Sequence, residues 1–468
     1  MKRRVAALAG VGLLALAACG HADPAASGGS DGGGETSAAA TEDRHRAEVG
    51  ALTPRIVLAH DGGVTTLDST DGEVLDETEL NGYVRLNPAG DGRHVMVSAE
   101  ESFTAYDTGL EATAHGDHFH YYEQDPALTG ITLDAPSPGH VVTHGDRAAL
   151  FADGTGAVTV YDPTSLAEGD LGVVEELTTD AAHHGVAVPL EDGGVLVTQG
   201  TEDERHTIQA LDADGKVVAQ TDDCPGVHGE AAAVPAEDGS DVVSFGCENG
   251  PVVYSGGEFH KVAVDGDYQR SGNQKGSEAS PIVLADNKVE ADPEGGTEHP
   301  TSVALIDTRD ASMATVDLGS PYWFRSLDRG PDGEALVLTG DGELNILDPE
   351  SGKILHEVKV AEPWEEPEQW QTPGPMLSVA DGTAFVVDPA QQKLTMVDVA
   401  SGEVYRELDL PVVPNEIQVV TGTASGEYEV GGESHEGHGH EGENADHDDH
   451  DHDHDHDHED EASDGGEA

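Results

Sequence analysis

Short runs rich in apolar and β-branched residues, each ending in an aspartate and a polar turn, recur along most of the chain. Examples are "TTLDSTDGEVL", "VTVYDPTSLAEG", "LNILDPESGKIL" and "TMVDVASGEVY". β-branched runs that stop at Asp and Gly predict a strand that leads into a tight turn. Strong amphipathic helix patterns are absent, which excludes solenoids built on helix pairs. The pattern therefore predicts an all-β protein.

The strand-and-turn unit repeats about every 39 to 55 residues. One aspartate anchors nearly every unit, and a serine replaces it once: Asp68, Asp107, Asp162, Asp212, Ser255, Asp307, Asp348 and Asp398. A period of about 40 to 50 residues with several short strands per unit is typical of β-propeller blades. Eight blades fit best. Seven blades are the alternative, because units of 50 or more residues make the boundaries between blades hard to assign.

The two ends of the repeat region predict how the ring closes. The first unit, from Thr53, lacks an obvious innermost strand, whereas "PNEIQVV" after the last unit is a strand without a blade. Together they would complete one blade. We therefore expect a propeller over residues 53–424.

Residues 1–19, "MKRRVAALAGVGLLALAAC", have a basic start, a short apolar run and small residues before a cysteine, as in a secretory signal. The "LAAC" that ends at Cys19 resembles a bacterial lipobox, which would make Cys19 the lipid-modified N-terminus; an ordinary signal peptide is the alternative. Residues 20–52 are polar and Gly-rich, which predicts a flexible linker. No later segment approaches about 18 consecutive apolar residues. We expect a body that is lipid-anchored to the outer face of the cell membrane.

The formal net charge is -71, and removing the 18 acids of residues 425–468 still leaves -53 on the rest of the chain. Such a surface repels phosphate backbones and attracts cations. Nucleic acid is therefore excluded as a partner. Adaptation to a salty medium is an alternative explanation for the acidity.

Three units contain a His-Gly dipeptide, at His144, His184 and His228, which are 40 and 44 residues apart. Because innermost strands line the central channel of a propeller, equivalent positions would face one another there. We expect these imidazoles to share a metal site; structural histidines are the alternative.

The stretch "HGDHFHYYEQDP", residues 115–126, falls in an unusually long connection between the second and third units. We interpret it as a functional loop. Its His115, Asp117, His118 and His120 offer donors that suit Zn²⁺ better than copper, because clustered sulfur ligands are lacking. The alternative is a solvated polar loop.

The C-terminal segment, residues 425–468, alternates histidine with acids and has too little apolar content to fold. It offers many interchangeable weak metal sites, so we interpret it as a disordered zinc reservoir; a merely solubilising tail is the alternative. Its metal-binding histidines would be His435, His438, His440, His447, His450, His452, His454, His456 and His458.

Cys224 and Cys247 form an even pair in an exported protein, where a disulfide is the default interpretation. A metal site with two thiolates is the weaker alternative.

The motifs "HGDHFHYY", "GHVVTHG", "CPGVHGEA" and "FGCENG" together resemble the AztD-type zinc metallochaperones. These are exported β-propellers that hand zinc to the solute-binding protein of an ABC transporter. The resemblance covers about residues 53–424; the lipobox and the acidic tail are not part of the family pattern. It implies zinc binding by Asp117, His118, His120 and one or more of His144, His184 and His228, a Cys224–Cys247 disulfide, and an orienting role for His183 and Glu230.

We therefore interpret the protein as a monomeric zinc metallochaperone that passes its metal by ligand exchange to a zinc-specific solute-binding protein. A zinc hydrolase with Glu230 as base is disfavoured, because we find no His-Glu-x-x-His helix, nucleophile elbow or phosphate loop. A surface propeller that binds other proteins, with structural histidines, is the other alternative.

Overall fold

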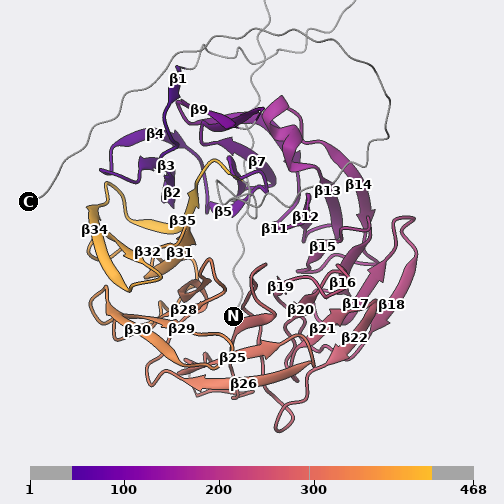
Figure 1. Ribbon diagram of the computed structural model, residues 1–468. Helices are drawn as coiled ribbons and strands as arrows, with labels where there is room; N and C mark the ends of the chain where they lie inside the picture. The colour runs from indigo at the N-terminus through magenta and orange to yellow at the C-terminus, as the bar shows by residue number, and fades with distance from the viewer. Residues whose placement is uncertain (1–44, 117, 295, 424–468) are drawn as a thin grey trace, which may run out of the picture.

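The computed structural model describes residues 45–116, 118–294 and 296–423. Within them, eight four-stranded antiparallel sheets are arranged around a central axis (Figure 1). The protein is therefore an eight-bladed β-propeller, as the repeat predicts. No helix in the described part of the chain is long and apolar enough to cross a membrane.

Blade 1 combines strands from the beginning and the end of the propeller sequence. The late strand β35 (Pro414–Val420) pairs with the early strand β2 (Arg55–His60), and β3 (Gly63–Asp68) and β4 (Val74–Glu79) complete the sheet. The register runs from Arg55 opposite Val420 to His60 opposite Pro414. This confirms that "PNEIQVV" supplies the missing innermost strand.

Blade 2 consists of β5 (Arg85–Pro88), β6 (His94–Ala99), β7 (Ser102–Asp107) and β10 (Ala127–Asp134). The next three blades contain four consecutive strands each: β11 (Pro138–His144), β12 (Arg147–Ala152), β13 (Ala157–Tyr161) and β14 (Val173–Thr178); β15 (Ala187–Pro189), β16 (Val195–Gly200), β17 (Arg205–Leu211) and β18 (Val217–Thr221); β19 (Glu230–Ala232), β20 (Val243–Phe245), β21 (Val252–Ser255) and β22 (Glu258–Lys261).

The last three blades follow the same order: β23 (Gln274–Lys275), β24 (Ile282–Asp286), β25 (Ser302–Asp307) and β26 (Ser312–Asp317); β27 (Leu327–Arg329), β28 (Ala335–Leu338), β29 (Glu343–Leu347) and β30 (Ile354–Lys359); β31 (Met376–Ala380), β32 (Thr383–Asp388), β33 (Lys393–Asp398) and β34 (Glu403–Asp409). Two 3₁₀ turns, η1 (Pro163–Glu168) and η2 (Phe324–Ser326), lie in connections.

Each anchoring residue of the repeat lies at the end of the third strand of its blade or directly after it. Its carboxylate usually accepts backbone N–H groups of the turn that follows. For example, Oδ1 of Asp398 lies 2.9 Å from the N–H of Ser401. The turn chemistry therefore explains the period that the sequence shows.

Blade 2 departs from this pattern, because a hairpin is inserted between its third and fourth strands. The hairpin consists of β8 (Leu110–His115) and β9 (His118–Gln124), and β1 (Arg46–Val49) pairs with β9 as a third strand. The expected functional loop is thus mainly a β-ribbon, which its alternating Thr, Phe and Tyr residues favour. The linker expected over residues 20–52 likewise includes a strand, because β9 supplies a partner for β1.

Apolar residues of the middle strands pack between neighbouring blades as a series of separate cores. Between blades 4 and 5, Cys224 and Cys247 form a disulfide with a Cα–Cα distance of 4.8 Å, and neither residue is exposed. The disulfide expected from the sequence is confirmed.

Candidate metal centres

Three histidines from successive blades converge on the channel. His140 belongs to β11, whereas His184 lies three residues before β15 and His228 two residues before β19, the innermost strands of the next two blades. The centroid of the His140 ring lies 4.8 Å from that of His184 and 5.6 Å from that of His228. The centroids of the His184 and His228 rings are 5.2 Å apart. One ligand nitrogen from each ring lies within 4.8 Å of the others, so these three residues, the channel triad, could hold a metal ion.

The Nδ1 atom of each ring in the channel triad already has a partner. Nδ1 of His140 lies 2.8 Å from the carbonyl oxygen of Gly185, and Nδ1 of His228 lies 2.7 Å from that of Gly272. Nδ1 of His184 lies 2.6 Å from Oδ2 of Asp153. Because a carbonyl oxygen only accepts, Nδ1 donates in His140 and His228, and in a neutral ring the lone pair is then on Nε2. Fixing the tautomer in this way is typical of metal-binding histidines.

Burial keeps two rings of the channel triad uncharged. Burial lowers the pKa of His228 to about 4, although the hydrogen bond to the carbonyl oxygen of Gly272 acts in the opposite direction. Burial is also the main cause that lowers the pKa of His140 well below its usual range. The neighbouring rings of the triad and nearby arginines lower both pKa values further. Neutral imidazole is the form that binds metal.

The structure places His144 away from the channel triad, at the opposite end of β11 from His140. Its Nε2 lies 2.7 Å from Oδ1 of Asp241, and its side chain is 8% exposed. Gly145, with φ of 55°, forms the turn to β12. Gly185, in contrast, is needed because a Cβ there would lie 2.2 Å from the ring of Phe151. The three His-Gly dipeptides therefore have different structural roles.

Sequence reasoning missed His140, although a signal was present. His140, His184 and His228 are separated by 44 residues each, a more regular spacing than the 40 and 44 of the dipeptides. Regular spacing at the blade period identifies equivalent positions on innermost strands.

The two residues expected to orient a ligand have different surroundings. Both ring nitrogens of His183 already have partners: Nδ1 lies 2.9 Å from the carbonyl oxygen of Ala181, and Nε2 lies 3.1 Å from Oγ1 of Thr198 on β16. Glu230 is the first residue of β19. Burial raises the pKa of its carboxyl to about 8, although the positive charge of Lys275 acts in the opposite direction.

A second cluster lies on one face of the β8–β9 hairpin. His115 is opposite His118 in the register, and His120 is two residues further along the same face. Nε2 of His120 is 3.3 Å from Nε2 of His118 and 3.3 Å from Nδ1 of His115. Tetrahedral bonds of about 2.0–2.1 Å place ligand nitrogens about 3.4 Å apart. These residues, the hairpin triad, thus form a second possible metal site, while Asp117 lies outside the described residues.

The N-terminal strand contributes a carboxylate to the hairpin triad. Nδ1 of His120 lies 2.8 Å from Oε1 of Glu48 on β1. Sequence reasoning missed Glu48, because its segment reads as linker and only the pairing of β1 with β9 brings it there.

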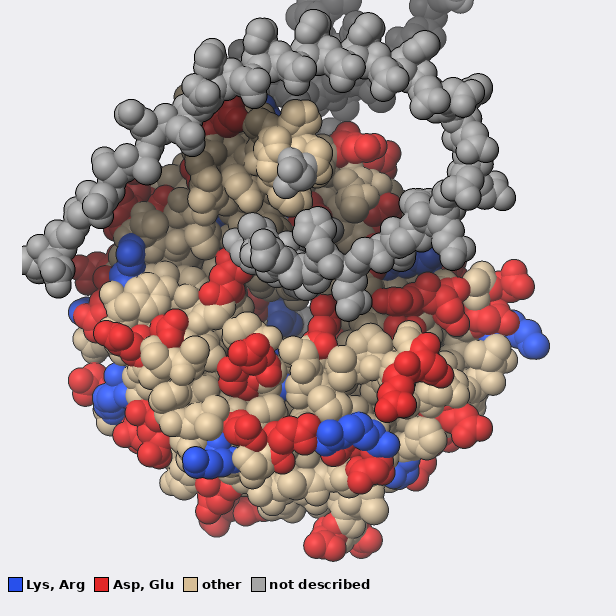
Figure 2. Space-filling view, viewed as in Figure 1, with Lys and Arg blue, Asp and Glu red and all other residues tan. Residues whose placement is uncertain are grey.

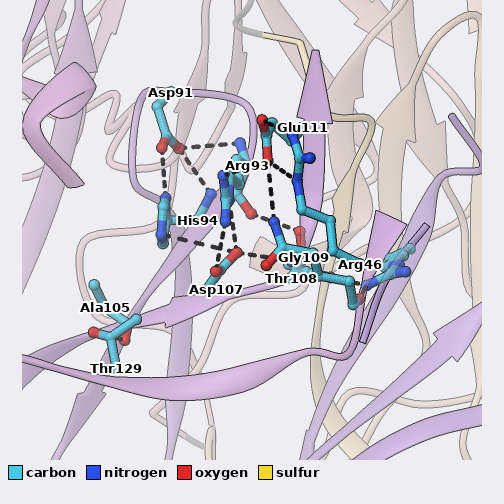
Figure 3. Close-up of polar contacts among 12 residues, drawn as sticks. Arg46, Asp91, Arg93, His94, Ala105, Asp107, Thr108, Gly109, Glu111 and Thr129 are labelled. Atoms are coloured by element: carbon cyan, nitrogen blue, oxygen red, sulfur yellow. Dashed lines mark hydrogen bonds and ion pairs between the residues drawn. The ribbon is translucent and has the colours of Figure 1, made fainter. Parts of the chain in front are cut away.

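An ion-pair network anchors the hairpin to blade 2 (Figure 3). Asp107, the anchoring aspartate of this blade, accepts two 2.8 Å bonds from Arg93. Glu111 on β8 lies 3.8 Å from Arg93 and 2.7 Å from Arg46 of β1. The bond to Arg46 is the main cause that lowers the pKa of Glu111. The hairpin triad therefore stands on a base that is tied to both the blade and the N-terminal strand.

The fold and the two triads define an eight-bladed β-propeller with two clusters suited to a metal ion. No protein-family model matches the chain. It is 25% identical over 396 residues to the zinc chaperone AztD of Citrobacter koseri, covering 80% of this chain and 87% of the relative. The resemblance to AztD-type zinc chaperones is thereby confirmed.

Two solved structures of the Citrobacter koseri protein have the same fold. The crystal structure of AztD superimposes with a TM-score of 0.68 at 23% identity, over 80% of this chain and 99% of the other. The apo form of AztD gives a TM-score of 0.66 at 22% identity, over 79% and 98%.

Proposed function

We propose that this protein is an extracytoplasmic zinc chaperone and that the channel triad is its tight site. The observation that carries the proposal is the set of Nδ1 partners of His140, His184 and His228, which leaves Nε2 as the metal-binding nitrogen of three rings whose ligand atoms lie within 4.8 Å of one another. The similarity to a zinc chaperone supports zinc as the metal. The protein acts as a carrier rather than an enzyme.

The hairpin triad serves as a more accessible exchange site. Exposure differs most between two pairs of rings: His115 and His118 are exposed, whereas burial lowers the pKa of His140 and His228. His184 is the accessible member of the channel triad, with a side chain that is 40% exposed. Exposed ligands can be replaced one at a time by those of another protein, without release of the metal into water.

The acceptor in this proposal is the solute-binding protein of a zinc ABC importer. The lipobox ending at Cys19 would hold the chaperone at the outer face of the membrane, where such acceptors work. The histidine-rich segment 425–468 would raise the local zinc concentration. Both segments lie outside the described residues.

Zinc stoichiometry and affinity measured by competition would test the proposal. We would use a chain that ends at Thr423, since this retains every described strand. His140→Ala and His118→Ala should each remove one bound ion, the first with the greater loss of affinity. His299→Ala is the matched control, because His299 is 51% exposed and bonded to Glu366. Unchanged binding in both triad variants would refute the proposed sites.

Acceptor loading would test the chaperone function itself. Apo solute-binding protein should acquire zinc from the loaded chain faster than from the same concentration of zinc held by a small chelator of equal affinity. Equal rates would indicate transfer through free zinc and would contradict direct exchange.

A further inference from the structure

One face of the sheet formed by β1, β9 and β8 connects the N-terminal strand to the hairpin triad. Arg46 and Glu48 are two residues apart on β1, so both side chains lie on the same face. Nδ1 of His120 lies 2.8 Å from Oε1 of Glu48. Nε2 of the same ring lies 3.3 Å from Nε2 of His118 and 3.3 Å from Nδ1 of His115. The His120 ring therefore presents one nitrogen to β1 and the other to the position that a metal ion would occupy.

The contact between Glu48 and His120 fixes the tautomer of the ring. An ionised carboxylate only accepts hydrogen bonds, so Nδ1 of His120 donates and the lone pair of the neutral ring is on Nε2. Histidines that bind metal commonly donate their other N–H to a carboxylate, which fixes the orientation of the ring and raises its basicity. Glu48 lies where such a carboxylate acts, on the side of the ring away from the other two histidines.

Few contacts hold β1 on the hairpin. The strand is four residues long, and its side chains alternate between exposed and partly exposed positions. Arg46 anchors it, because Nη2 donates a 2.7 Å bond to Oε1 of Glu111 (Figure 3) and Cζ lies 3.4 Å from the centroid of the Tyr122 ring. A short edge strand with little buried apolar surface opens at a low free-energy cost. The docking of β1 is therefore sensitive to a single additional interaction.

The charge around the hairpin triad favours a cation. Basic residues are scarce in this chain, with 22 against 93 acidic ones, and acidic side chains are spread over the visible face of the propeller (Figure 2). Arg46 and Arg93 are both directed to Glu111, whereas the carboxylate of Glu48 is directed to an imidazole. A divalent ion bound by three neutral imidazoles keeps its full charge, so a carboxylate behind one of the rings is favourable.

Metal binding changes the strength of the contact between β1 and His120. Without metal the contact contributes little, because the side chain of Glu48 is 60% exposed and that of His120 is 36% exposed. With a metal on Nε2 the ring carries part of the positive charge, so its Nδ1–H becomes a charge-assisted donor to the carboxylate. Binding at the triad and docking of β1 then favour each other by the same factor.

We propose that zinc at the hairpin triad holds β1 on β9, and that Glu48 is the positioning residue that transmits this effect through His120. The inference rests on the proposed function, since it takes the hairpin triad as a zinc site. Detaching β1 lowers the affinity of this exchange site for zinc. A partner that displaces β1 would therefore draw the metal off more easily.

Amide hydrogen exchange on the full chain would test the proposal, because it reports on β1 separately from the other parts of the protein. A chelator buffer would set the free zinc concentration. Saturating zinc should slow the exchange of residues 46–49 about tenfold, the low end of the effect of a carboxylate behind a metal-binding histidine, since this pair is exposed. β34, another outer strand with mainly exposed residues, is the internal control and should not change.

Two variants separate positioning from structural support. Glu48→Gln retains an acceptor but removes the charge, so the zinc-dependent slowing should fall to less than about threefold. Glu350→Gln is the matched control, because Glu350 is 52% exposed and pairs with Arg309. Arg46→Ala should speed the exchange of β1 by the same factor with and without zinc, since Arg46 contacts Glu111 and Tyr122. An Arg46 variant that loses as much of the zinc effect as Glu48→Gln would indicate general loosening and overturn the positioning role.

A His118→Ala variant distinguishes failure of the inference from failure of the proposed function. If this variant has lost one bound ion but exchange of β1 in the native protein does not respond to zinc, the inference is overturned and the proposed function stands. Slowing by zinc that persists in the His118 variant would also overturn the inference. A His118 variant that binds as many zinc ions as the native protein would overturn the proposed hairpin site itself.

Discussion

Oδ2 of Asp153, which follows the second strand of blade 3, lies 2.6 Å from Nδ1 of His184 at the start of blade 4. The carboxylate of one blade thus orients a ring that belongs to the next. Because all three Nδ1 atoms of the channel triad are held in this way, the ring positions depend on the packing of adjacent blades.

Asp153→Asn should weaken zinc binding at the channel triad by about 10- to 100-fold, because the amide no longer fixes the Nε2 lone pair of His184 or strengthens its basicity. Competition titration of the chain ending at Thr423 would measure this. Asp307→Asn, on an outer surface beside Arg309, is the control and should leave affinity unchanged.

His144→Ala and His140→Ala should have opposite consequences. His144→Ala should retain the channel metal but lower the free energy of unfolding by about 1–3 kcal/mol, because Asp241 loses its buried partner. His140→Ala should lose the metal. Denaturant unfolding and zinc titration of both variants would separate the two roles. Loss of metal in the His144 variant would show that this residue is a ligand.

The two buried imidazoles of the channel triad should destabilise the apo protein as pH falls from about 6.5 toward 4, whereas Glu230, whose pKa is raised to about 8, has the opposite effect. The pKa of His228 is lowered to about 4 and that of His140 is also lowered, so in this range the unfolded chain binds protons that the native state does not. His228→Gln should therefore show a smaller loss of stability over the same range. Parallel pH profiles of urea unfolding for the two proteins would contradict this assignment.

Removing the disulfide should affect both stability and metal binding. Cys224 and Cys247 flank the segment in which the N–H of His228 bonds to the oxygen of Gly246 at 3.0 Å. Replacing both cysteines by serine should cost about 2–4 kcal/mol of unfolding free energy. We also expect weaker binding at the channel triad with unchanged binding at the hairpin triad. Equal weakening of the two sites would indicate a global effect.

Much of the fold could be predicted from the sequence, because its determinants are local. Anchoring aspartates such as Asp68 and Asp398 cap turns within a few residues of themselves, and they mark the third strand of each blade. The closing strand β35 was recognisable because it lacked neighbours of its own. Continuous apolar runs mark the middle strands, such as β2 and β6, which are buried along nearly their whole length.

The candidate sites were only partly predictable. His184 and His228 belong to the channel triad as expected, and His115, His118 and His120 lie together on the hairpin. His140 and His144 lie four residues apart on the same strand, β11, and only the tertiary structure shows which of them lies level with His184. Glu48 and Asp153 come from segments whose positions depend on pairing between distant parts of the chain.

The sequence by itself determined the eight-unit repeat, the closure of the ring, the acidic surface and the residue types available to bind metal, because these follow from local patterns and composition. Only the tertiary structure decided which histidines meet and which carbonyl or carboxylate orients each ring. Those relationships join residues of different blades, and their geometry arises when the ring closes.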